Sequence, residues 1–584
     1  MALTRRTFLT AATAAATLGL AAPARAEDAF DAARLRWTGM IAGGAFDPGD
    51  PDFAAKVAAV DSAAASLRAS MSPDPARPSL WPGLPLDDPR TGNFSRAYSQ
   101  VRGMALGWAT PGTRMHGDAA FAADVVSALD FLYEHAYNER LERQNSNWFW
   151  WEIGVPRSLT DTCALLYEDI PAGRLDVWFG PLLRWCPDAD HRISNATITE
   201  TGANRTNKAM AVAMRGVLTR DATAIELARD GISDKLGGGR WSLLKLTEGP
   251  RDGFYRDGSF IQHEFYPYTG AYGTDHLDGV ARLITLYAGS PWDIADPDVV
   301  NVFDIVDRSF IPVIYDGLMM DMVRGRQISV QGWRDTDAGQ KALEGILILL
   351  EGAPRAYAER WRPVIKGWVT RNTVHPFLAR AGLPAVRQAK AILNDAAVPT
   401  GPRTEGTYVF ADMDRVVHRR PTWAYAISMC SERIGAAEGI NLENLHGWYT
   451  GDGMTRAAGP DGRRARPVGR LGRRLRHPRS HPLRRTPTQH LGGTHGSRTQ
   501  PPRAARRHDG RPRRPAHRRR PGPGRRRPSG GPHRLRLDGD LPQLLRPPAA
   551  RQDPPHLRRR HRRAPLLGVR HRPQHLPRPG LGPA

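Results

Sequence analysis

The chain has 584 residues, of which 40% are hydrophobic, and a formal net charge of +24, so it is long enough for two to four domains with a sizeable core. The charge is uneven: residues 457–584 hold 35 Arg, no Lys and 5 Asp, a local charge of 35 − 5 = +30, which leaves 24 − 30 = −6 for residues 1–456. A mildly acidic globular part argues against nucleic-acid binding as its function.

The N-terminal residues 1–26 carry the signals of an exported protein. Residues 4–9 read TRRTFL, a twin-arginine pattern, and an Ala/Leu-rich run follows, ending in a small-residue site at residues 24–26. The apolar run is shorter than the ~20 residues that a membrane span requires. We therefore expect a signal peptide and a secreted, extracellular protein exported by the twin-arginine pathway, with no membrane span.

Three cysteines are present, at Cys163, Cys186 and Cys430, without the spacing of a metal site. Twin-arginine substrates usually cross the membrane folded, so the fold should not depend on disulfides. We expect buried free thiols, no metal and no other cofactor.

Residues 27–396 have the apolar spacing of amphipathic helices, with hydrophobic residues recurring at three and four positions. The clearest predicted helices are Phe53–Met71, Phe121–Asn138, Asn207–Asp221, His276–Ala288, Val299–Tyr315 and Ala338–Glu351. Many helices of similar length with short connections favour a ring or stack of helical hairpins.

The pattern changes to strands in residues 397–456. Residues 407–411, 415–419 and 423–429 are rich in β-branched and aromatic residues and partly alternate. A second, β-sheet domain is predicted to begin there.

The tail, residues 457–584, contains no Ile, Lys, Phe, Tyr, Trp, Met, Asn, Glu or Cys. Such a segment cannot bury enough apolar surface to offset chain entropy, so we expect it to be disordered. It is either a basic arm for polyanions or the product of a frameshift in a GC-rich gene. The abrupt switch within a strand-forming domain favours the frameshift.

The chemistry is concentrated in a glycine-punctuated loop. Residues 252–263 read DGFYRDGSFIQH and residues 268–273 read YTGAYG. His263 and Tyr272 lie nine residues apart, with no cysteine or carboxylate cluster beside them. Loops on a rigid scaffold commonly carry catalytic residues, and this pair indicates metal-free acid/base chemistry.

Four other segments have a functional and a plain interpretation. Residues 145–157 hold four adjacent aromatic residues, which either stack on sugar rings or pack in the core. Residues 201–205 (TGANR) hold an asparagine, which either binds substrate or caps a helix. The arginines of residues 324–329 (RGRQIS) bind an anion or form a solvated turn. The fourth segment, residues 438–454, reads EGINLENLHGWYTGDGM.

Taken together, the aromatic-EIGVPR, TGANR, DGSFIQH…YTGAYG, RGRxIS and ENxxGWYTGDGM segments resemble polysaccharide lyase family 8, the hyaluronate, chondroitin and xanthan lyases. The resemblance runs from about residue 30 to residue 454. It implies an α+β multidomain protein, with an incomplete α/α toroid followed by an antiparallel β-sandwich domain. That second domain is truncated or scrambled after about residue 456. The polymer would lie in the cleft between the two domains.

The resemblance also implies the roles of eight residues. Catalytic roles fall on Asn204, His263, Tyr272, Arg326 and Glu438, and substrate contacts on Trp148, Phe149 and Asn441. Arg324 is a further expected substrate contact, because two guanidinium groups close together suit a carboxylate or sulfate. Asn204 would neutralise the substrate carboxylate and Arg326 would orient the substrate. Val330 stands where the family usually has a second arginine, so part of the anion contact is missing.

The implied reaction is β-elimination on a uronate polymer. Either His263 or ionised Tyr272 takes the C5 proton, and Tyr272 then donates to the leaving oxygen. Hyaluronate is the first expected substrate, chondroitin the second and xanthan the third. We expect a monomer whose only partner is an acidic polysaccharide.

Two other functions compete with this interpretation. A glycoside hydrolase would need two opposed carboxylates, for which Asp252, Asp257 and Glu264 are available. A truncated, inactive pseudoenzyme or polyanion-binding protein is the other alternative, because the aberrant tail replaces most of the β-sandwich. We expect weak or no lyase activity from the literal chain, and activity from a frame-corrected one.

Overall fold

The computed structural model describes residues 26–447, 449–459 and 490–491. The chain divides into two units, residues 1–497 and 498–584, and every described residue belongs to the first. The predicted signal peptide lies outside the described residues apart from Ala26. The predicted disordered tail also lies outside them, apart from residues 457–459 and 490–491.

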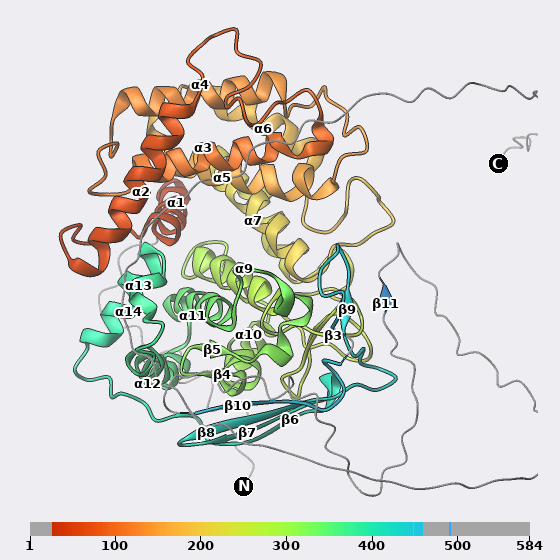
Figure 1. The fold of residues 1–584 in the computed structure, drawn as a ribbon. Helices are drawn as coiled ribbons and strands as arrows, with labels where there is room; N and C mark the ends of the chain where they lie inside the picture. The colour runs from red at the N-terminus through yellow and green to blue at the C-terminus, as the bar shows by residue number, and fades with distance from the viewer. Residues whose placement is uncertain (1–25, 448, 460–489, 492–584) are drawn as a thin grey trace, which may run out of the picture. The chain divides into compact units, whose positions relative to one another are not determined.

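The N-terminal part of the described chain forms a series of helices (Figure 1). They are α1 (Ala26–Ala42), α2 (Pro51–Ser70), α3 (Asn93–Ala109), α4 (Ala119–His135), α5 (Val155–Leu165) and α6 (Arg174–Trp185). Aspartates begin two of them: Asp50 accepts the Asp52 N–H at 2.9 Å before α2, and Asp118 accepts the Ala120 N–H at 2.8 Å before α4. These N-caps satisfy donors that the first turn leaves without a partner.

The second series continues the same architecture. It comprises α7 (Gly202–Thr219), α8 (Ala222–Ile232), α9 (Tyr272–Tyr287), α10 (Val299–Ile305), α11 (Asp335–Gly352), α12 (Arg355–Arg371), α13 (Phe377–Arg380) and α14 (Leu383–Asn394). Helices α3, α5, α7, α9 and α11 pack in that order, each against the next. A β-carbon at Gly279 of α9 would collide with Thr206 of α7, so these two helices approach closely. The arrangement is the expected incomplete α/α toroid.

Five of the six predicted helices are confirmed to within a few residues, but Val299–Tyr315 is wrong at its C-terminal end. Helix α10 ends at Ile305, and the chain continues as a π-helical turn, a 3-10 turn and then β4 (Ile314–Tyr315). β4 pairs with β5 (Leu318–Met319) through a turn in which Asp316 and Gly317 have φ values of 46° and 83°. The last two residues of the predicted helix therefore form a strand, because a tight hairpin turn follows them.

The loop that holds His263 is a small antiparallel sheet, which the sequence did not predict. Its strands are β1 (Gly253–Phe254), β2 (Phe260–Gln262) and β3 (Tyr266–Pro267), in the order β1-β2-β3. Gln262 pairs with Tyr266, so His263 lies in the turn between β2 and β3.

A four-stranded antiparallel sheet follows the helices (Figure 1). Its order is β10-β8-β7-β6, with β6 (Gly406–Phe410), β7 (Arg415–Arg420), β8 (Trp423–Ser428) and β10 (Met454–Ala458). The three predicted strands are confirmed. A separate short strand, β9 (Glu438–Gly439), pairs in parallel with β11 (His490–Leu491).

Two buried arginines of β7 fix this sheet to the helical part. Arg419 donates from Nη1 to the carbonyls of Pro312 and Ile314, both at 2.8 Å, and Arg415 donates from Nε to the Met322 carbonyl at 2.9 Å. Burial lowers the pKa of both guanidinium groups to about 10, so they remain charged at neutral pH. The sheet is thereby held against the segment that leads to Arg326.

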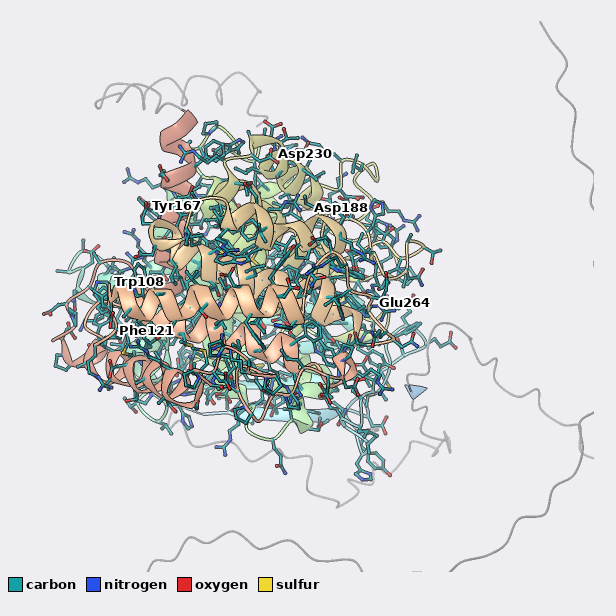
Figure 2. The ribbon with its side chains drawn as sticks, turned by 90° about the horizontal axis from the view of Figure 1, so that it is seen from above. Trp108, Phe121, Tyr167, Asp188, Asp230 and Glu264 are labelled. Carbon is teal, nitrogen blue, oxygen red and sulfur yellow. The ribbon has the colours of Figure 1, made fainter. Side chains whose placement is uncertain are left out.

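Side chains fill the space between the helices (Figure 2). Cys163 and Cys186 are buried free thiols, as predicted, whereas Cys430 is half-buried. In the described part of the chain, none of the helices has both the length and the apolar character that crossing a bilayer demands.

Candidate active site

His263 occupies a backbone conformation that L-residues rarely adopt. Its φ is +54°, and the next residue, Glu264, has a φ of +66°. The Nδ1 atom of His263 lies 2.6 Å from Oε1 of Glu438 on β9, and 37% of the His263 side chain is exposed. The helical part and the segment that follows the first three strands of the sheet therefore meet at this imidazole.

Glu438 is buried and accepts hydrogen bonds from several donors. Besides His263, its carboxylate accepts from Nη1 of Arg326 at 2.8 Å and from the Tyr268 hydroxyl. Burial alone would raise the pKa of Glu438, but these donors outweigh it and hold the pKa below its ordinary value. An ionised carboxylate only accepts, so Nδ1 of neutral His263 carries the proton and Nε2 keeps its lone pair.

Arg326 connects the carboxylate to the second catalytic candidate. Its Nη2 donates to the Tyr272 hydroxyl at 3.0 Å, its Nε to Oε2 of Glu443 at 2.6 Å, and its backbone N–H to the Tyr268 hydroxyl at 3.1 Å. Burial would lower the pKa of Arg326, yet its partners raise it above the ordinary value. The guanidinium is a fixed positive charge at the centre of the site.

Tyr272 is the first residue of α9 and faces His263. The two ring centroids are 5.0 Å apart, with an angle of 67° between the planes. Burial raises the pKa of Tyr272, and the hydrogen bond and charge of Arg326 only partly oppose this. The phenol is therefore protonated at neutral pH, with its oxygen accepting from Arg326.

Asn204 lies in the first turn of α7, half-buried, and α7 packs against α9, whose first residue is Tyr272. It is not the N-cap, a position that Thr201 occupies. Its side-chain amide makes no hydrogen bond to any residue that the structure describes. The amide is thus available to a ligand, although no hydrogen bond joins Asn204 to His263 or Tyr272.

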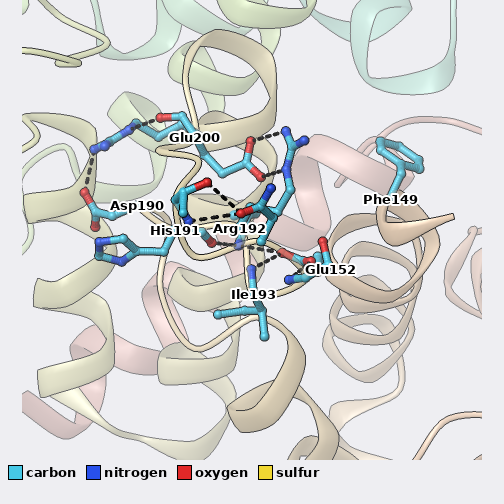
Figure 3. Close-up of polar contacts among 12 residues, drawn as sticks. Phe149, Glu152, Asp190, His191, Arg192, Ile193 and Glu200 are labelled. Atoms are coloured by element: carbon cyan, nitrogen blue, oxygen red, sulfur yellow. Dashed lines mark hydrogen bonds and ion pairs between the residues drawn. The ribbon is translucent and has the colours of Figure 1, made fainter. Parts of the chain in front are cut away.

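The aromatic segment divides between core and surface. Trp151 is buried at 1% exposure, whereas Phe149 is 41% exposed. Trp148 is half-buried, and the guanidinium of Arg192 lies 3.8 Å from its ring centroid. Arg192 also pairs with Glu200 through two hydrogen bonds of 2.9 and 3.1 Å (Figure 3). One face of Trp148 is therefore covered by a cation that is itself fixed to the segment before α7.

A buried ion pair supports that segment. Glu152 accepts the backbone N–H groups of Ile193 and Ser194, both at 2.8 Å, and lies 3.2 Å from Nζ of Lys208 on α7. Both charged side chains are fully buried. Figure 3 shows Glu152 beside Arg192 and Ile193, while Phe149 lies apart from the network. Glu152 thus fixes the loop between the aromatic residues and Asn204.

Two predicted substrate-binding residues are not brought into this group. Arg324 is only 3% exposed, and its guanidinium donates to Asp321 at 2.6 Å and to the Trp333 carbonyl at 2.7 Å. It is therefore placed to support the loop, not to contact a ligand. Asn441 is exposed, has a φ of +58° and follows β9. Val330, at the position of the missing arginine, ends the short helix that contains Arg326.

Two residues of the network were missed from the sequence. Tyr268 is fully buried, and its hydroxyl contacts both Glu438 and Arg326. Glu443 accepts from Arg326. The only sequence signal was that Tyr268 lies in residues 268–273 and Glu443 in residues 438–454. These segments contain so many polar residues that the sequence alone does not show which of them belong to the site.

A cavity of about 610 Å³ adjoins the site without reaching His263, Tyr272 or Arg326. It is lined by the start of α7, by Asp252 and by a rim of basic side chains, namely Arg240, Lys245, Arg251, Arg256 and Arg308. In Figure 2, Glu264 lies toward the same edge of the molecule as Asp188, which precedes the loop before α7.

No cluster of three or more His, Cys, Asp or Glu side chains suited to a metal ion occurs among the described residues.

Comparison with known proteins places this geometry in context. The sequence model described as "Polysaccharide lyase family 8, N terminal alpha-helical domain" matches residues 37–367, and that of the "super-sandwich domain" of the same family matches residues 405–463. A hyaluronate lyase of Thermasporomyces composti is 39% identical over 75% of this chain and 54% of its own length. A xanthan lyase of Bacillus sp. (strain GL1) is 36% identical over 74% of this chain and 45% of its own length.

A solved structure agrees. The chondroitin AC lyase of Streptomyces coelicolor A3, in complex with chondroitin sulphate, superposes with a TM-score of 0.68 at 38% identity. The match covers 75% of this chain and 58% of that one. The chain spans about half the length of the curated relatives that it matches.

Proposed function

The chain belongs to polysaccharide lyase family 8, and from this premise we propose that it cleaves uronate-containing glycosaminoglycans by β-elimination, hyaluronate first and chondroitin second. The observation that carries the proposal is the continuous hydrogen-bonded chain from His263 through Glu438 and Arg326 to Tyr272. It presents one free imidazole nitrogen and one protonated phenol to the same space, which are the two groups that such an elimination needs.

His263 is the proposed base. Its Nε2 lone pair accepts the C5 proton of a bound uronate, and the electron pair of the C5–H bond forms the C4–C5 double bond. The imidazolium that results is stabilised by the Glu438 carboxylate, 2.6 Å from Nδ1. The alternative, in which ionised Tyr272 takes the proton, is disfavoured because burial raises the pKa of that phenol.

Tyr272 is the proposed acid. As the bond between C4 and the glycosidic oxygen breaks, the phenol donates its proton to the leaving oxygen. Arg326 donates to the phenol oxygen at 3.0 Å and so stabilises the negative charge that develops there. No water is consumed, and the new chain end is an unsaturated uronide.

Asn204 is the proposed acceptor site for the charge that builds up on the uronate carboxylate. Removing the C5 proton pushes electron density into that carboxylate, and a preorganised amide donor stabilises it. The half-buried amide of Asn204, which makes no hydrogen bond to the described residues, is suited to this role.

The substrate order is proposed on the aromatic segment and on the relatives. Exposed Phe149 and half-buried Trp148 offer ring faces on which sugar rings stack. Relatives named hyaluronate lyase, chondroitin AC lyase and xanthan lyase all resemble this chain, so chondroitin and xanthan follow hyaluronate as candidates. Arg324 and Asn441 would then support the binding loops, with no direct contact assigned to Arg324.

Two further functions are weighed against this one. Two of the three carboxylates that a hydrolase would use are held by the protein: Asp252 accepts from Gln262 and the Glu264 N–H, and Asp257 accepts from Ser259 and the Asp412 N–H. A non-catalytic polyanion-binding protein is favoured by the local charge of +30 in residues 457–584. It predicts saturable binding of hyaluronate without any product.

We also propose export through the twin-arginine pathway and action as a monomer. The export proposal is carried by the TRRTFL sequence at residues 4–9. Replacing both arginines, Arg5 and Arg6, with lysine should retain the protein in the cell; undiminished export would contradict the proposal. Light scattering of the purified chain gives its molar mass in solution, which tests whether it is a monomer.

The direct test of the lyase proposal is product absorbance. The 584-residue chain is incubated with hyaluronate, chondroitin and xanthan at enzyme concentrations high enough to detect weak turnover. Unsaturated uronides absorb in the ultraviolet, and Tyr272→Phe should abolish them while leaving polymer binding intact. Undiminished product formation by that variant would remove Tyr272 from its role.

A further inference from the structure

The turn that presents His263 is formed from residues poorly suited to it. His263 and Glu264 have φ values of +54° and +66° in succession, a combination that hairpins normally give to Asn-Gly or Gly-Gly. Neither residue is glycine, and holding non-glycine residues in this region costs backbone free energy that the surrounding structure must offset. Something outside the turn must therefore hold it.

The side chain of Asp252 is the group that holds the turn. Its Oδ1 accepts the backbone N–H of Glu264 at 2.8 Å, and its Oδ2 accepts Nε2 of Gln262 at 2.5 Å. The carboxylate thus contacts the residues on both sides of His263. Asp252 is itself fixed directly before β1, where its carbonyl accepts a hydrogen bond from the Thr247 hydroxyl at 3.1 Å.

The imidazole is fixed independently by Glu438 at Nδ1. Asp252 acts on the backbone of the turn and Glu438 on the ring, so together they determine both where His263 lies and which nitrogen is free. The Asp252 carboxyl is half-buried, and burial raises its pKa, while the backbone N–H groups of Glu264 and His263 oppose that shift.

We propose that Asp252 is a positioning residue, which holds the left-handed His263–Glu264 turn so that the imidazole points at the substrate. The inference rests on the proposed function, because the role assigned to Asp252 is exerted through the proposed base. It assigns a task to a carboxylate that otherwise resembles a catalytic group of a hydrolase.

The role requires hydrogen-bond acceptance and not negative charge, and this makes a rescue possible. In Asp252→Asn, the amide oxygen still accepts from Glu264. Rotation of the Gln262 amide turns its Oε1, which is buried and has no partner in the described part of the chain, toward the new Nδ2–H. Asp252→Ala offers no acceptor to either group.

The kinetic test compares these variants on hyaluronate. Asp252→Ala should lower kcat by about 30- to 100-fold with little change in KM, since a misplaced catalytic group costs about this much. Asp252→Asn should stay within about fivefold of the parent chain. Asp257→Ala is the matched control: Asp257, between β1 and β2, also accepts backbone N–H groups, from Ser259 at 2.8 Å and Asp412 at 2.9 Å, but makes no hydrogen bond to the turn. Its kcat should change by less than about threefold.

A double-mutant cycle separates positioning from general structural damage. If Asp252 acts through His263, Asp252→Ala should have no further effect on kcat in a His263→Ala background. Additive losses, a loss below about threefold for Asp252→Ala, or an Asp252→Asn variant as damaged as Asp252→Ala would each overturn the inference.

A second readout does not depend on turnover. Diethyl pyrocarbonate acylates accessible imidazole, and peptide mapping gives the rate for His263 alone. Releasing the turn should raise that rate at least about threefold in Asp252→Ala but not in Asp257→Ala. If neither the parent chain nor any variant forms product, the proposed function fails for the 584-residue chain and this rate decides the positioning role by itself; equal rates in the two variants would refute it.

Discussion

Replacing Glu438 with glutamine tests the link between the imidazole and the rest of the site. The substitution keeps the size of the side chain but leaves one acceptor oxygen and one amide group. If the oxygen faces Nδ1 of His263, the amide points its hydrogens at Nη1 of Arg326, which lies 2.8 Å from the carboxylate. If it is reversed, the amide donates to Nδ1, and the proton of neutral His263 moves to Nε2. Both arrangements weaken the proposed base.

The size of the effect follows from the geometry. Opposite charges about 4 Å apart near a protein surface attract by about 4 kcal/mol. His263 is 37% exposed, and the proton is only partly transferred in the transition state. We therefore expect about half of this, about 2 kcal/mol, which is about a 30-fold loss in kcat. Because Glu438 does not contact the sugar in this account, KM should change little.

The assay is the initial rate of ultraviolet absorbance on hyaluronate, with kcat and KM as ratios to the unsubstituted chain. Glu443→Gln is the control, because Glu443 pairs with the same Arg326 at 2.6 Å but is 37% exposed and does not contact His263. Its loss should be less than about fivefold, as for an exposed pair. If Glu438→Gln keeps kcat within threefold of the parent while remaining folded, the argument for a fixed imidazole tautomer is wrong.

Three further outcomes are expected. Asn204→Ala should lower kcat by about 10²- to 10³-fold, the usual cost of removing one preorganised donor, and a change confined to KM would show a binding role only. Lys208→Met leaves the Glu152 charge buried without its cation, so denaturant unfolding should show a loss of about 3 kcal/mol; a loss below about 1 kcal/mol would contradict the ion-pair account. Glu438 has a folded-state pKa below its ordinary value of 4.5, so the stability that its ionisation contributes is present above pH 4.5 and is lost as pH falls through the folded value. The melting temperature of the parent chain should exceed that of Glu438→Gln at neutral pH, and this difference should vanish on acidification. A difference that grows on acidification would contradict the claim that ionised Glu438 stabilises the fold.

Part of this structure could be predicted from the pattern of residues alone. The helices from Phe53 to Glu351 and the three strands after residue 405 follow from apolar periodicity, which local sequence determines well. The strands around His263 are only two or three residues long, too short to leave a period. The end of the predicted Val299–Tyr315 helix failed because a hairpin formed by Asp316 and Gly317 took its last residues into a strand.

The candidate site could be predicted in membership but not in arrangement. His263, Tyr272, Arg326 and Glu438 were named from motifs and lie in one hydrogen-bonded network. Tyr268 was missed, because its role depends on a contact between residues 170 positions apart in the sequence. Arg324 has the same residue type as Arg326, two positions away, and only their partners in the fold separate their roles: Arg324 donates to Asp321 and the Trp333 carbonyl, and Arg326 to Glu438 and Tyr272.

The central claim is that His263 and Tyr272 break the polymer by elimination. Mass spectrometry of hyaluronate products, recorded together with their ultraviolet absorbance, tests it most directly. The account predicts that every new non-reducing end is one water lighter than a saturated oligosaccharide, and that such ends disappear with Tyr272→Phe and with His263→Ala. Saturated products, or unsaturated products that persist in both variants, would contradict it.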